Sequence, residues 1–118
     1  MKTDFLAERI GAKVLRGSAS GPVEIQRVYA GDRMSDLLNQ VSDTTLLVTN
    51  LSNSAIIRIV ELMDVPGICL LNGVKPETGL LDAAEEHGTV LMVSPDGMFE
   101  TCGRLYQVLG GNAQGHRE

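Results

Sequence analysis

Apolar residues follow two patterns along this chain: short continuous runs, and positions spaced three or four residues apart. Continuous apolar runs rich in Val, Ile and Leu mark predicted strands at residues 44–49, 67–71 and 89–93, and a more polar segment at residues 24–30 also reads as a strand. The helical spacing predicts helices at residues 32–41, 53–63, 76–87 and 96–109. The two patterns alternate, so a predicted helix follows each of these strands.

This alternation predicts the fold class. The connecting loops have about two to six residues, which is the usual length between strands and helices in such units. Strand centres such as Leu46-Leu47-Val48 are apolar throughout, as expected when helices cover both faces of a parallel sheet. We therefore expect an α/β fold, a three-layer α/β/α sandwich with a mainly parallel central sheet, Rossmann-like, with right-handed crossovers.

The length of 118 residues is that of one domain. Before the alternating part, the pattern predicts a short helix that Thr3 or Asp4 caps and that runs through Ile10, ended by Gly11, and a short strand at residues 13–16. We expect a single domain over residues 1–110. In it, an accessory helix, strand and loop (residues 1–22) precede the core (23–110), and residues 111–118 form a flexible tail.

Charge and composition narrow the range of partners. The net charge is −5, the Lys and Arg residues are scattered, and aromatic residues are few with no Trp. This composition argues against nucleic acid and against an anionic membrane surface as partners. No apolar run approaches the roughly 20 residues that span a bilayer. Cys69 and Cys102 lie in apolar settings without neighbouring His or Cys, so we expect free thiols in a reducing cytoplasm, without a metal or cofactor.

The predicted helix at residues 53–63 is apolar on more than one side, and only Arg58 and Glu61 interrupt the apolar surface after Ala55. Two interpretations stay open, because a helix that is apolar all round must be buried by something. It packs deeply against the sheet, or its second apolar side forms a homodimer interface. The residues expected in that interface are Ile56, Ile59, Val60 and Met63.

Polar residues gather where the predicted strands end. Ligands of open parallel sheets bind at the carboxyl ends of the strands. The residues there that we expect to line a ligand site are Asn50, Asn53, Asn72, Gly73 and Lys75, with Asp32 and Ser94 at its margin.

Helix capping is a competing explanation for some of these positions. Asp32, Ser52 or Asn53, and Asp96 stand where a helix needs an N-cap, and Pro76 stands at a first helical position. Asn50, Asn72 and Lys75 are the residues that capping explains least.

Catalytic motifs are not apparent. The chain lacks the GxxxxGK[ST] phosphate loop, and no GxGxxG follows a predicted strand. His87 stands at a helix end, where an interaction with the helix dipole accounts for it. Without a suitably placed His, no Ser–His or Cys–His pair can be argued. We therefore expect no catalytic residues and a protein that is not an enzyme.

Several segments together resemble the DRTGG domain family, whose members are related to the N-terminal domain of HPr kinase. The segments that carry the resemblance are Gly31-Asp32-Arg33-Met34-Ser35-Asp36-Leu37-Leu38, Leu47-Val48-Thr49-Asn50, Leu70-Leu71-Asn72-Gly73-Val74-Lys75-Pro76-Glu77 and Met98-Phe99-Glu100-Thr101-Cys102-Gly103-Arg104-Leu105-Tyr106. The likeness extends over nearly the whole chain up to Gly110. It is particularly close to small stand-alone members with an Asn-Gly pair in place of Thr-Gly-Gly.

The resemblance implies a three-layer α/β fold, frequent dimerisation and a regulatory or ligand-sensing role, and such small members are often encoded near iron-only hydrogenases. The positions that name the family hold Asn50-Leu51 and Leu71-Asn72-Gly73 here, so only Gly73 is retained. We expect a homodimeric regulatory module that binds a small molecule or a partner protein at the strand-end loops. The alternatives are a purely structural dimerisation domain and, less favoured, an enzyme of phosphoryl transfer.

Overall fold

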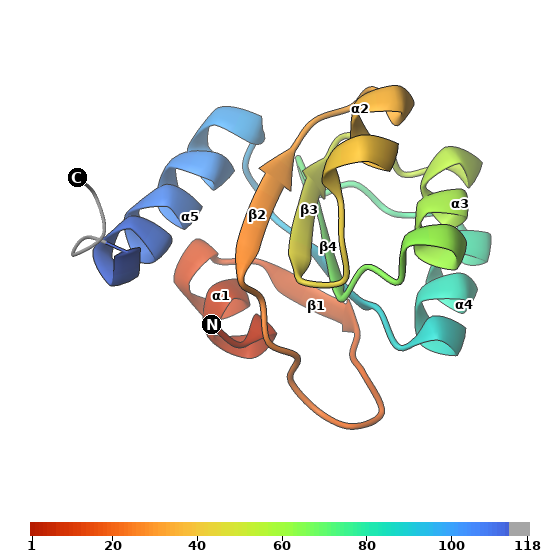
Figure 1. Cartoon of the computed structure of the whole chain (residues 1–118), viewed down its shortest axis with the longest axis horizontal. Coiled ribbons are helices and arrows are strands. Elements are labelled where there is room, and N and C mark those ends of the chain that lie inside the picture. The colour runs from red at the N-terminus through yellow and green to blue at the C-terminus, as the bar shows by residue number, and fades with distance from the viewer. Residues whose placement is uncertain (114–118) are drawn as a thin grey trace.

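The computed structural model describes residues 1–113 and contains a single five-stranded sheet (Figure 1). The elements in chain order are α1 (Thr3–Ile10), β1 (Lys13–Arg16), β2 (Arg27–Ala30), α2 (Met34–Gln40), β3 (Thr45–Thr49), α3 (Ser54–Met63), β4 (Gly67–Leu70), α4 (Thr78–His87), β5 (Val90–Val93) and α5 (Met98–Ala113). The three-layer α/β architecture expected from the sequence is confirmed.

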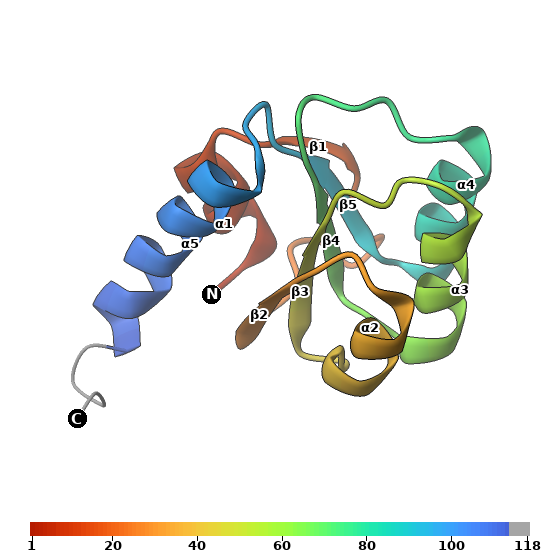
Figure 2. The same cartoon turned by 90° about the horizontal axis from the view of Figure 1, so that it is seen from above.

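The strand order is β1-β5-β4-β3-β2, so the four strands of the alternating part are neighbours in chain order. These four are parallel, while β1 runs antiparallel to β5 and pairs Lys13 with Val93. Successive right-handed crossovers in one direction place their helices on one face. Figure 2 shows α2, α3 and α4 on that face and α1 and α5 on the other.

Side chains that alternate along the strands divide the core in two. Leu47, Ile68 and Leu91 pack under α2, α3 and α4. Their neighbours Leu46 and Cys69 pack under α1 and α5. Both sets are fully buried, which explains why the central strands read as continuous apolar runs.

The burial of side chains on α3 distinguishes between the two interpretations of its apolar surface. Ile56, Ile59 and Val60 are at most 1% exposed and belong to the core of the single chain. The prediction that they form a homodimer interface is therefore wrong, because their side chains already pack against the sheet and α4. Met63 is half-buried, and Leu62 is the large apolar residue of α3 that faces solvent.

Several boundaries differ from the predicted ones. Residues 24–26 lie outside β2, and the N-terminal segment pairs with the first two of them: Ile25 donates its N–H to the Met1 carbonyl (2.7 Å), and Lys2 forms a bridge with Glu24. Helix α4 begins two residues after Pro76. Residues 111–113, predicted as part of the flexible tail, continue α5, and residues 114–118 of that prediction lie outside the described residues. No helix in the described part is long and apolar enough to cross a membrane.

Candidate functional site

The chain leaves the sheet in opposite directions after two neighbouring strands, β4 and β5. The loop after β4 leads to α4 on one face, and the loop after β5 leads to α5 on the other (Figure 2). Such a divergence opens a crevice at the carboxyl ends of parallel strands, where ligands of α/β proteins bind. The antiparallel strand β1 adds its first residues to the same place, because Lys13 pairs with Val93 at the end of β5.

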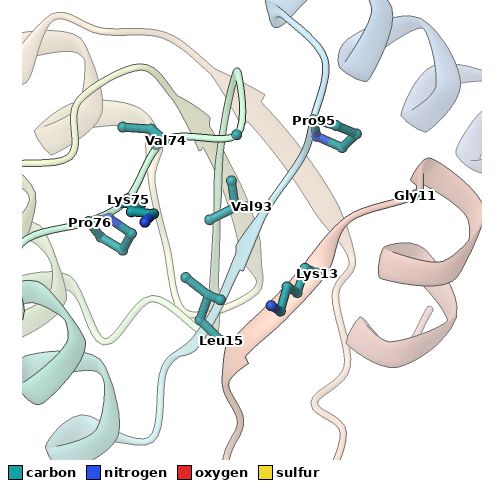
Figure 3. Close-up of a pocket in the computed structure, with 9 residues that line it drawn as sticks. Gly11, Lys13, Leu15, Val74, Lys75, Pro76, Val93 and Pro95 are labelled. Atoms are coloured by element: carbon teal, nitrogen blue, oxygen red, sulfur yellow. The ribbon is translucent and has the colours of Figure 1, made fainter.

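A cavity of about 360 Å³ occupies this crevice (Figure 3). Its lining residues come from the start of β1, the loop after β4 and the end of β5; they are Gly11, Lys13, Leu15, Gly73, Val74, Lys75, Pro76, Val93 and Pro95. Most of this surface is apolar, and the two lysines approach from different elements. Small-molecule sites have this character, a mainly apolar concave surface with a few polar groups.

A tight turn shapes one wall of the cavity. Asn72 and Gly73 both have positive φ angles, 59° and 61°, and Val74 donates its N–H to the Leu71 carbonyl (3.2 Å). Two successive positive φ angles are typical of a type I′ turn, for which Asn-Gly is the preferred pair. The backbone N–H of Asn72 donates to the Asp96 carbonyl (2.9 Å), and that of Gly73 donates to the Ser94 carbonyl (2.8 Å). These bonds fix the loop that carries Lys75 against the end of β5.

A chain of hydrogen bonds joins three strand ends beside the cavity. The carboxylate of Asp32 accepts bonds from the Thr49 hydroxyl (2.9 Å), the Asn50 backbone N–H (2.7 Å) and the Asn50 side chain (3.1 Å). The Asn72 side chain in turn donates to Oδ1 of Asn50 (3.3 Å). The strand register brings these groups together, because Ala30 pairs with Val48 and Thr49 pairs with Leu70.

This arrangement determines the charge of Asp32. Partial burial alone would raise the pKa of its carboxyl, but the hydrogen bonds from Asn50 and Thr49 outweigh burial and hold that pKa below its ordinary value. Asp32 is therefore a carboxylate at neutral pH and a fixed acceptor for the loop after β3. The prediction that it caps α2 is wrong, since Arg33 is the N-cap residue and no side chain caps that helix.

The other predicted site residues have separate roles. Asn53 caps α3, as the capping explanation expected, and accepts a bond from the Ala55 N–H (3.0 Å). Ser94 is fully buried and shares a hydrogen bond with Thr101 (2.7 Å). Asp96 forms an ion pair with Arg104, and its predicted capping role is wrong because α5 begins at Met98 and the Gly97 carbonyl accepts the N–H of Thr101. The predicted first helical position of Pro76 is also wrong, because Glu77 is the N-cap of α4.

The structure thus divides the predicted ligand residues between two neighbouring places. Gly73 and Lys75 line the cavity, whereas Asp32, Asn50 and Asn72 form the hydrogen-bonded chain beside it. Ligand binding by any of these residues stays a prediction. Sequence reasoning missed Gly11 and Lys13, because only the pairing of β1 with β5 brings them to the carboxyl ends of the parallel strands.

Comparison with known proteins identifies a structural relative. The chain is similar to a solved structure of the CBS and DRTGG domains from the regulatory region of Clostridium perfringens pyrophosphatase, complexed with the activator diadenosine tetraphosphate. The TM-score is 0.74 at 14% sequence identity, over 89% of this chain and 46% of that one. The likeness supports a DRTGG-related fold. This chain spans about half the length of that regulatory region. No protein-family model and no curated protein matches the sequence.

Proposed function

We propose that this protein is a non-catalytic regulatory module that binds a small molecule in the cavity between the loops after β4 and β5. The observation that carries the proposal is the position of the cavity, where the chain diverges to opposite faces of the sheet. The turn at Asn72-Gly73 holds one wall in place before any ligand arrives. A preformed wall lowers the entropy cost of binding. The structural relative is itself a regulatory region complexed with a small activator, which supports the same class of function.

The side chains near the cavity favour binding over catalysis. Ser94, the hydroxyl nearest in sequence to the end of β5, is buried and bonded to Thr101, so it is not available as a nucleophile. His87 lies at the opposite end of α4 from the strand-end loops. An activated nucleophile needs a base within hydrogen-bond reach, and Ser94 and His87 do not form such a pair at the cavity.

A cavity-filling variant tests the proposal. Val74 is half-buried in the cavity wall, so Val74→Trp should occupy part of the space without replacing a core residue. A library of metabolites and nucleotides would be screened by thermal shift on the natural protein, on Val74→Trp and on the control Leu38→Trp, whose site on α2 is 45% exposed. The proposal expects compounds that stabilise the natural protein and the control but not Val74→Trp. Stabilisation that survives in Val74→Trp would place binding elsewhere.

A homodimer remains the second candidate, now through a different surface. The most exposed large apolar residues are Phe99 (86%) and Tyr106 (69%), both on α5. Helix α5 lies beside β2, which is an edge strand of the sheet. The apolar groove of about 290 Å³ between them is lined by Val28, Ala30, Cys102, Leu105, Tyr106 and Leu109. Two copies of β2 paired about a two-fold axis would extend the sheet and bring two identical apolar grooves together.

Sedimentation velocity tests this candidate. The natural protein should sediment as a dimer at micromolar concentration, and Tyr106→Glu should sediment as a monomer. Phe5→Glu serves as the control, because Phe5 is also exposed (39%) but lies on α1. A monomeric natural protein removes the candidate and leaves the ligand site unaffected.

A further inference from the structure

The cavity at the ends of β4 and β5 has an unusual concentration of positive charge for this chain. The sequence contains only three lysines, Lys2, Lys13 and Lys75, and two of them line this one cavity. The chain as a whole carries a net charge of −5, so its overall field does not favour anions. The two lysines come from β1 and from the loop after β4, which meet only through folding (Figure 3).

Neither lysine forms an ion pair or a side-chain hydrogen bond with another residue of the described range 1–113. Four other cations of the described residues pair with carboxylates: Arg16 with Glu85, Arg33 with Asp36, Arg104 with Asp96 and the terminal amine with Glu24. Among the same residues, Lys13 and Lys75 form no ion pair, and no acidic side chain lines the cavity. Both lysines are exposed and line the same cavity, so an anion bound there has two positive neighbours that no carboxylate of the described residues already holds.

Most backbone N–H groups of the loop after β4 are already used in hydrogen bonds and so cannot bind an anion. The N–H groups of Asn72, Gly73 and Val74 already donate to carbonyl oxygens, and Pro76 has no N–H, so within residues 72–76 only the Lys75 N–H is left for a ligand. Recognition of a negative group in this cavity therefore depends mainly on Lys13 and Lys75. The remaining surface, formed largely by Leu15, Val74 and Val93, suits an apolar body. The volume of about 360 Å³ lies near the lower end of the range of small-molecule sites, which suits a compact ligand.

We infer that the ligand of this cavity is a small anion with an apolar body, whose carboxylate or phosphate is held between Lys13 and Lys75. This inference rests on the proposed function and adds the chemical class of the ligand. Lys13 and Lys75 determine specificity for the negative group, and the apolar surface selects the rest of the molecule. The chain of Asp32, Asn50 and Asn72 lies outside the cavity lining and positions the loop.

Three matched probes test the charge requirement: benzoate, phenyl phosphate and neutral benzamide, titrated into the labelled protein and followed by amide chemical shifts. Either anion should shift the signals of Val74, Lys75 and Val93. Benzamide should bind roughly tenfold more weakly, the difference expected from one charge-assisted hydrogen bond. The two anions distinguish a carboxylate site from a phosphate site.

Three lysine variants complete the test. Lys13→Met and Lys75→Met should each weaken the better anion by roughly tenfold. Lys2→Met removes the same charge outside the cavity and should leave the affinity unchanged. Three results would overturn the inference. Benzamide could bind as tightly as the anions, or Lys2→Met could weaken the anion as much as the two cavity variants do. The third is that neither anion shifts any signal at millimolar concentration. The library screen on Val74→Trp is independent of probe charge, so cavity binding of neutral compounds would preserve the proposed function while this inference fails.

Discussion

The side-chain NH2 of Asn72 donates a hydrogen bond to Oδ1 of Asn50 (3.3 Å), joining the loops after β4 and β3. Asn50 in turn donates to Asp32, so one chain of polar contacts connects the ends of three neighbouring strands. Asn72 also begins the turn that carries Gly73 and Lys75 to the cavity. Asn72 therefore belongs both to the chain of hydrogen bonds and to the turn that forms a wall of the cavity.

Substitutions of Asn72 separate its backbone role from its side-chain role. Asn72→Ala removes the hydrogen bond and places an alanine at a φ of 59°, so the free energy of unfolding should fall by about 1–3 kcal/mol. Asn72→Gly removes the same bond but tolerates the positive φ, and should lose less. Urea unfolding measures both values. An equal loss in the two variants would mean that the backbone conformation contributes nothing.

The lowered pKa of Asp32 predicts a dependence of stability on pH. The folded state binds the proton more weakly than the unfolded state, whose ordinary value is 3.8. The stabilisation is therefore complete above that value and is lost as the pH falls through the lower, folded pKa. Urea unfolding between pH 7 and pH 2 should show a smaller acid loss in Asp32→Asn than in the natural protein. Parallel pH profiles for the two proteins would contradict the prediction.

Helix α3 should behave as part of the core. Ile59→Ala removes a fully buried side chain and should cost about 2–5 kcal/mol of unfolding free energy. Leu62→Ala, on the same helix but 63% exposed, should change it by less than about 0.5 kcal/mol. Urea unfolding and sedimentation should be measured on both. An unchanged stability with an altered oligomeric state in Ile59→Ala would restore the interface interpretation.

The two cysteines should differ in reactivity. Burial raises the pKa of the Cys69 thiol to about 12, and it raises the pKa of the half-buried Cys102 thiol as well. The thiolate is the reactive form, so Cys69 should react with Ellman's reagent at pH 8 only after unfolding. Cys102 should react slowly in the folded protein. A Cys102→Ser variant that still shows a folded-state reaction would contradict this order.

The sequence by itself determined most of the architecture. Continuous apolar runs such as Leu46-Leu47-Val48 predicted strands covered on both faces, and the helical spacing between them predicted the crossovers. These signals are local and periodic, so they can be read from the sequence without knowing which elements pack against each other. The cap at Asn53 is equally local, because its side chain bonds to the backbone two residues later.

Tertiary structure decided the uses of the polar residues. Asp32 reads as a helix cap in sequence, yet the register of β2 with β3 places it against Asn50 instead. The extra apolar surface of α3 suggested an interface, but burial by α4 and the sheet accounts for it. Lys13 carries no local signal at all, and only the antiparallel pairing of β1 with β5 brings it to the cavity that Lys75 lines. Periodicity reports which side of an element is buried, whereas strand order and register determine which distant side chains meet.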